Sequence, residues 1–200
     1  MRPLVALALV VAGPALAGEP CFDANAQRSG PLQPSLALAS DGRELSDAGQ
    51  RGELVWARRR GRVERPLETL RAFLEDPRHF KDDKVDEMTL RRLAPGPNLS
   101  HVSVHSRVRP FPFVTVEWTD EWTVSLLAGT EARPEKLLVS YQKVAGTSYI
   151  AHWCGDLVLT RVDDQTTDVA QYEEAKITGR SHEEMKQGLA GFLDTLRALP

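Results

Sequence analysis

The residue with the clearest chemical potential in this sequence is Asp120, which stands between Trp118 and Trp122. Side chains alternate across a β-strand, so a strand through this segment would place all three on one face. Burial would raise the pKa of such a carboxyl group, unless Arg58 or Arg60 from an earlier strand offset it. The group could then remove a proton, position water or fix a polar group of a ligand. A β-bulge that turns Asp120 out to water is the alternative.

Apart from Asp120, neither the histidines nor any known catalytic motif indicates a catalytic or metal site in this sequence. His101 and His105 would share a strand face, but four residues at about 3.3 Å each separate them by roughly 13 Å, too far to chelate one metal ion. Both alternate with valines and are expected to face solvent, and His152 is expected on the face opposite Trp153. The sequence contains no Gly-rich phosphate loop, no Gly-x-Ser-x-Gly elbow and no His-Glu-x-x-His helix. It predicts no metal, no cofactor and no identifiable catalytic set.

The first residues are typical of a secretory signal peptide. Arg2 supplies the positive charge, residues 4–12 are apolar, and Ala15-Leu16-Ala17 is a small-residue cleavage signal, so we assign residues 1–17 to the signal. The apolar stretch is too short to span a bilayer. An N-terminal anchor that is never cut is the alternative. The prediction is an exported protein, periplasmic or extracellular.

The two cysteines, Cys21 and Cys154, would meet an oxidising environment after export. Cys154 has the same strand parity as His152 and Asp156, which places it on the outer face of a sheet. Residues 18–52, rich in Gly, Pro, Ser, Ala and Asp, read as an extended arm or linker that could cross this face and present Cys21. We therefore predict a Cys21–Cys154 disulfide, with two free thiols as the alternative.

Charge argues against a nucleic-acid partner. The chain has 25 basic and 28 acidic residues, and the signal removes one arginine, which leaves a mildly acidic mature protein. The basic run at residues 58–62 would alternate between two strand faces and form no dense patch. The expectation is a monomer whose partner is not a nucleic acid.

From residue 53 to the C-terminus the pattern is that of one α+β domain. A strand at 53–64 is followed by a helix that begins after Pro66 and ends or kinks at Asp76-Pro77. Six further strands are expected at residues 84–93, 99–109, 113–127, 136–144, 148–162 and 166–178. Between 113 and 127 the even positions are apolar, apart from Asp120, and the odd positions are polar. This strand should therefore have one dry and one wet face.

A long helix closes the chain. Ser181 and Glu184 form a capping box at its start. Its apolar stripe consists of Met185, Leu189, Phe192, Leu196 and Leu199. This stripe should cover the dry face of the sheet. Three strands with dry faces offer more apolar surface than one helix covers, so a cavity is expected, with Phe111 and Phe113 beside its mouth or in an ordinary packed turn.

Two segments resemble a known superfamily. Residues 63–70, Val-Glu-Arg-Pro-Leu-Glu-Thr-Leu, followed by Leu-Glu-Asp-Pro at 74–77, are similar to the strand-to-helix entry of START-like (SRPBCC, helix-grip) domains. Residues 155–159 and 166–172 are similar to the last hairpin of these domains. The resemblance implies a helix-grip fold, in which a curved antiparallel sheet of about seven strands wraps around the C-terminal helix, with short helices after the first strand. Its members include lipid-transfer domains and polyketide cyclases.

These observations favour a noncatalytic carrier or sensor of a hydrophobic small molecule or lipid, with room for a transient membrane contact. The residues expected at the ligand are Val104, Trp118, Asp120, Trp122, Tyr141, Trp153, Leu189 and Phe192. One alternative is a cyclase- or hydrolase-type enzyme that uses Asp120 in the cavity. The other is an envelope accessory protein that acts through protein contacts.

Overall fold

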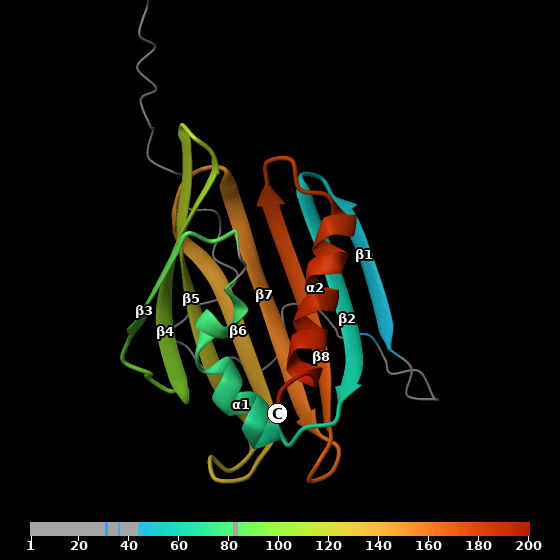
Figure 1. Cartoon of the computed structure of the whole chain (residues 1–200). Coiled ribbons are helices and arrows are strands. Elements are labelled where there is room, and N and C mark those ends of the chain that lie inside the picture. The colour runs from blue at the N-terminus through green and yellow to red at the C-terminus, as the bar shows by residue number, and fades with distance from the viewer. Residues whose placement is uncertain (1–30, 32–35, 37–43, 82–83) are drawn as a thin grey trace, which may run out of the picture.

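The computed structural model describes residues 31, 36, 44–81 and 84–200, which form one antiparallel sheet with both α-helices on the same face (Figure 1). The strands are β1 Leu45–Arg51, β2 Leu54–Val63, β3 Glu87–Arg92, β4 Ser100–Phe111, β5 Val114–Gly129, β6 Pro134–Gly146, β7 Ile150–Arg161 and β8 Thr167–Ile177. The helices are α1 Leu67–Leu74, the 3₁₀ turn η1 Pro77–Phe80, and α2 His182–Arg197. Within these described ranges no helix is long and apolar enough to cross a membrane.

The strand order is β1-β2-β8-β7-β6-β5-β4-β3, so the first and last parts of the domain lie side by side. All seven strands expected from the sequence are present. The eighth, β1, lies in the segment that the sequence analysis assigned to an extended arm, and that assignment was wrong for residues 45–51. The sequence of these residues has no alternating pattern. The strand forms because its backbone pairs with β2, from Leu45 opposite Arg60 to Arg51 opposite Leu54.

The two helices cover different parts of the sheet. Helix α2 packs across β1, β2 and β8, and α1 packs against β6 and β7. The predicted capping box is present, because Ser181 accepts a hydrogen bond from the Glu184 amide while the Glu184 carboxylate accepts one from the Ser181 amide. The buried residues of α2 are Met185, Leu189, Leu193 and Leu196. The stripe therefore includes Leu193, which the four-three spacing omitted, and leaves Phe192 at its partly buried edge.

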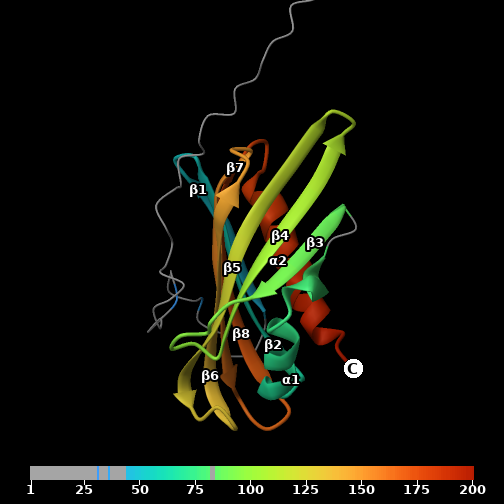
Figure 2. The ribbon, with the colours of Figure 1, turned by 90° about the vertical axis from the view of Figure 1, so that its left-hand side faces the viewer.

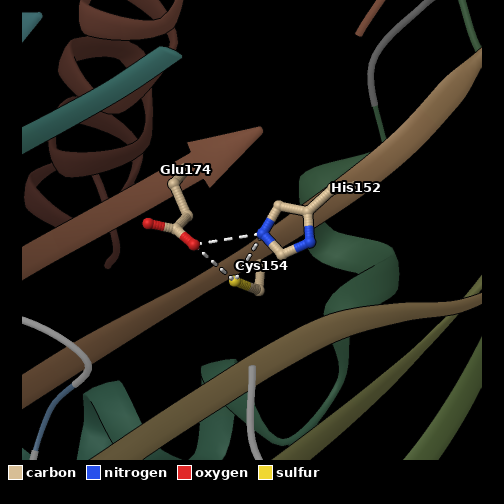
Figure 3. Close-up of side chains that lie close together, drawn as sticks. All are labelled: His152, Cys154 and Glu174. Carbon is tan, nitrogen blue, oxygen red and sulfur yellow. Dashed lines mark hydrogen bonds and ion pairs between the residues drawn. The ribbon is translucent and has the colours of Figure 1, made fainter. Parts of the chain in front are cut away.

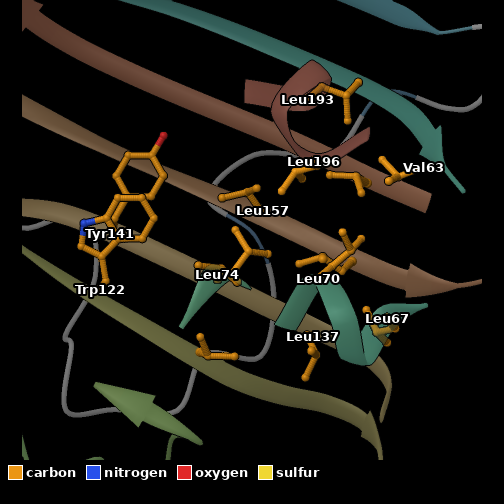
Figure 4. Packing of buried hydrophobic residues seen from close by; sticks show 14 of the residues in the cluster. Val63, Leu67, Leu70, Leu74, Trp122, Leu137, Tyr141, Leu157, Leu193 and Leu196 are labelled. Carbon is orange, nitrogen blue, oxygen red and sulfur yellow. The ribbon is translucent and has the colours of Figure 1, made fainter. Parts of the chain in front are cut away.

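The main core fills the layer between the helices and the sheet (Figure 4). Leu70 and Leu74 of α1, Leu157 of β7 and Leu196 of α2 are all buried there. In Figure 4, the rings of Trp122 and Tyr141 lie at one end of this cluster, Leu67 and Leu70 of α1 lie toward the other, and Leu74 lies between them. The α1 end is therefore ordinary aliphatic core, and the buried polar side chains on this face, such as Asp120, lie near the aromatic end.

The opposite face of β5 is polar, as predicted, but in the middle of the sheet this face is not wet, and it also holds a small buried apolar cluster of Leu138, Val158 and Ala170. Thr123 is 4 % exposed and Ser125 is 2 % exposed. Polar groups pair with one another there, as in the 2.6 Å hydrogen bond that Ser140 donates to Asp156. The expectation that His101 faces solvent was also wrong, because its ring is buried and its Nε2 lies 3.1 Å from Glu121.

The β4–β5 hairpin extends past its neighbours (Figure 2). Its tip carries exposed aromatic side chains. Phe113 is fully exposed and Phe111 is largely exposed. Neither belongs to a hydrophobic cluster of the described residues. They do not form the packed turn that was one of the two expectations. The signal segment 1–17 and Cys21 lie outside the described residues.

Candidate functional site

Asp120 is buried on the helix-covered face of the sheet, where it is only 3 % exposed. It lies opposite Val104, a core residue of β4. On its other side the register shifts, since Thr119 faces Ala145 of β6 whereas Asp120 faces Lys143. The bulge expected near Asp120 therefore exists, but its extra residue lies on β6. Asp120 is not turned out to water, and of the two arrangements left open by the sequence the structure has the buried one.

Burial sets the protonation of Asp120. Desolvation raises its pKa from 3.8 to about 8, although the indole N–H of Trp118 donates a 2.8 Å hydrogen bond to Oδ2 and Lys143 also favours the charged form. The arginines considered as counter-ions lie on the opposite face, where Arg58 pairs with Asp47 and Arg60 pairs with Asp168. Asp120 is consequently a neutral carboxylic acid at pH 7.

A second carboxyl group buried on this face lies three strands away, at Glu173 of β8. The hydroxyl of Tyr141 donates a 2.6 Å hydrogen bond to its Oε2. Burial raises the pKa of Glu173, although the charge of Arg180 opposes this rise. Burial and the neighbouring Glu173 also hold the pKa of Tyr141 well above its ordinary value, so the phenol keeps its proton and remains a donor.

Gly155 makes the bond between Tyr141 and Glu173 possible. It lies on β7, directly between Tyr141 of β6 and Glu173 of β8. A Cβ at Gly155 would overlap the phenol oxygen and ring of Tyr141. The absence of a side chain therefore lets the tyrosine lie across β7 and reach the carboxyl group.

Aromatic rings connect these polar groups to the helices. Trp122 stacks on Tyr141 with ring centroids 4.5 Å apart, and Tyr141 meets Trp153 edge-on at 5.6 Å. On the helix side, Phe80 of η1 stacks on Phe192 of α2 at 4.2 Å and lies 6.3 Å from Trp122. We call this set the aromatic group, consisting of Phe80, Trp118, Trp122, Tyr141, Trp153 and Phe192. It bridges the sheet and α2.

The structure thus brings together most of the residues predicted at the ligand. Trp118, Trp122, Tyr141, Trp153 and Phe192 belong to the aromatic group, and Val104 lies beside Asp120. Leu189 lies apart from the group in a second cluster with Met185 and Ala57, which Trp153 also contacts.

Sequence reasoning missed Phe80, Gly155 and Glu173. Alternation could have found Glu173, since it shares a strand face with the buried Val169 and Ala175. No periodic pattern marks Phe80, because it lies in a short 3₁₀ turn.

The outer face carries a separate cluster of His152, Cys154 and Glu174 (Figure 3). His152 Nε2 lies 3.1 Å from Glu174 Oε1 and 3.5 Å from Cys154 Sγ. The hydrogen bond from His152 lowers the pKa of Glu174. A metal site of this kind needs a thiolate, but the described part of the chain has no free cysteine. Cys154 is on the outer face, as predicted, and its pairing with Cys21 stays a prediction.

Comparisons with known proteins match the fold rather than the sequence. No family model matches the chain, and no curated protein matches it. A STAR-related lipid transfer protein from Xanthomonas axonopodis has a similar structure, with a TM-score of 0.59, 17 % identity, and coverage of 82 % of this chain and 96 % of that one. The human StarD13 lipid transfer and protein localization domain gives 0.55 at 10 % identity, covering 83 % and 86 %. Human STARD10 gives 0.51 at 12 %, covering 80 % and 73 %.

Proposed function

Since the chain has the START-like helix-grip fold predicted from its sequence, we propose that it binds or carries a hydrophobic small molecule or lipid between the sheet and α2. We further propose that it does so as an exported monomer without catalysing a reaction. The fold supports the hydrophobic class of ligand, because the similar structures include lipid transfer proteins and domains.

One observation carries this proposal beyond the fold. The aromatic group lies on the helix-covered face, and beside it are two buried carboxyl groups, Asp120 and Glu173, that an ordinary core would not contain. Binding sites for small molecules typically combine apolar and aromatic walls with a few convergent polar groups. Asp120 and Glu173 supply those polar groups, whereas the described residues at the α1 end of the layer include no buried carboxyl group on this face.

The ligand would enter where the helices meet the aromatic group. Phe80 of η1 stacks on Phe192 of α2 and on Trp122 of β5, so these rings connect the helices to the sheet. Phe80 and Phe192 are only partly buried, and η1 is a short 3₁₀ turn rather than a long helix. A small displacement of η1 would separate Phe80 from Trp122 without disturbing the aliphatic core around α1.

Binding of a fluorescent fatty acid, cis-parinaric acid, tests the proposal. We expect an affinity in the micromolar range or tighter, weakened at least tenfold by Phe192→Trp, which adds bulk beside Phe80. Val162→Trp is the control, because Val162 is exposed in the turn after β7. Absence of binding by the folded native protein, or equal binding by both variants, would contradict the proposed site.

A further inference from the structure

One oxygen of Asp120 has no hydrogen-bond partner among the residues that the structure describes. Oδ2 accepts the hydrogen bond from Trp118, but Oδ1 is fully buried and makes no hydrogen bond in the part of the chain that the structure describes. Buried side-chain oxygens nearly always have a partner. This atom lies in the interior on the face that carries Val104, Trp118 and Trp122, and it marks a position where a ligand atom would be satisfied.

The protonation of Asp120 decides whether that ligand atom is a donor or an acceptor. The carboxyl group is neutral at pH 7, because burial raises its pKa to about 8. Since Oδ2 accepts from the indole N–H, the proton belongs on Oδ1. Asp120 therefore offers an O–H donor that lacks an acceptor.

The charges around Asp120 disfavour a cationic ligand. Lys143 of β6 and Glu173 of β8 act on its carboxyl group, and Arg180, which follows β8, acts on Glu173. Among the described residues, neither the two carboxyl groups, Asp120 and Glu173, nor the two cations, Lys143 and Arg180, make an ion pair within 4 Å. Two cations already accompany the two carboxyl groups, so a ligand ammonium group would add positive charge, whereas a neutral acceptor would leave the balance unchanged.

We infer that the ligand is a neutral apolar molecule with a carbonyl group, whose oxygen accepts a hydrogen bond from Asp120 Oδ1. Its apolar body would lie against the rings of Trp122 and Trp153. This inference rests on the proposed function and adds the polar group that the site recognises.

A matched pair of probes separates the carbonyl group from the apolar body. Equilibrium dialysis at pH 6 would measure binding of 2-acetylnaphthalene and of 2-ethylnaphthalene, which differ in the carbonyl oxygen. We expect the ketone to bind at least tenfold more tightly to the native protein. Asp120→Leu should reduce this ratio to near one, whereas Asp86→Asn, at an exposed position, should leave it unchanged.

The pH dependence provides a second readout that does not depend on the leucine variant folding. The ratio should decline between pH 6 and pH 9 as Asp120 loses its proton, and in Asp120→Asn it should stay constant over this range. Equal binding of both probes to the native protein would overturn the inference but leave the proposed function standing if cis-parinaric acid binds. A ketone preference that survives in Asp120→Leu, or failure of both probes to bind, would also overturn it.

Discussion

Replacing Asp120 with asparagine should make the protein more stable as the pH rises, relative to the native chain. The folded-state pKa of Asp120 is raised to about 8, whereas the unfolded chain has the ordinary value of 3.8. Between these values the folded state holds a proton that the unfolded state releases. The stability linked to this proton is therefore fully present below the unfolded-state pKa and is lost as the pH rises through the folded-state pKa.

The size of the effect follows from the same two pKa values. Each pH step inside this window costs the native chain about 1.4 kcal/mol, so from pH 5 to pH 7 it should lose about 2 to 3 kcal/mol relative to Asp120→Asn. Asparagine has nearly the same shape, and its carbonyl oxygen can still accept the bond from Trp118. The pH dependence of the stability difference between the two proteins therefore reports the ionisation of Asp120 alone.

Urea unfolding followed by tryptophan fluorescence at pH 5, 6, 7 and 8 would measure this difference, provided that the slope with denaturant stays constant. Asp86→Asn makes the same chemical change at an exposed position, and its stability should run parallel to that of the native protein at every pH. If Asp120→Asn also runs parallel to the native protein, Asp120 ionises normally and the description of a buried neutral acid is wrong.

Three further predictions follow from the same contacts. Tyr141→Phe should destabilise the fold by about 1 to 3 kcal/mol in urea unfolding, because it removes the hydroxyl that donates a hydrogen bond to the buried Glu173; an unchanged midpoint would show that this bond contributes nothing. Trp118→Phe removes a hydrogen bond that lowers the pKa of Asp120, so this pKa should rise and the ketone preference should decline at higher pH than in the native protein. A decline at lower pH would show that the bond from Trp118 does not favour the charged form of Asp120. Thiol titration of the unfolded, nonreduced protein should detect no free thiol from its two cysteines, whereas two reactive thiols would exclude the predicted disulfide.

Much of this fold could be predicted from local patterns. Strict alternation in the segment of β5 identified its dry face, and the capping box fixed the start of α2 within one residue. Strand β1 escaped prediction because its stability comes from pairing with β2, which no pattern in residues 45–51 encodes. Burial of the outer face also escaped prediction, because polar strand positions are the same whether water or other polar groups satisfy them.

The sequence predicted correctly which site residues of one strand share a face, but it did not predict the contacts between residues on different strands. Trp118, Asp120 and Trp122 were grouped correctly because two-residue spacing places them on one face. The contact between Tyr141 and Glu173 depends on the register of β6, β7 and β8 and on Gly155 between them. Sequence spacing alone does not determine that register, nor the bulge on β6 that places Lys143 opposite Asp120.

The central claim is that the space between the sheet and α2 receives an apolar ligand. Its most direct test is a native mass spectrum of the protein, purified without denaturation and without added ligand. The expected spectrum contains the protein with one retained small molecule, which organic solvent extracts and which Phe192→Trp reduces. A spectrum of the bare protein alone, obtained under conditions that preserve known lipid complexes, would contradict the claim.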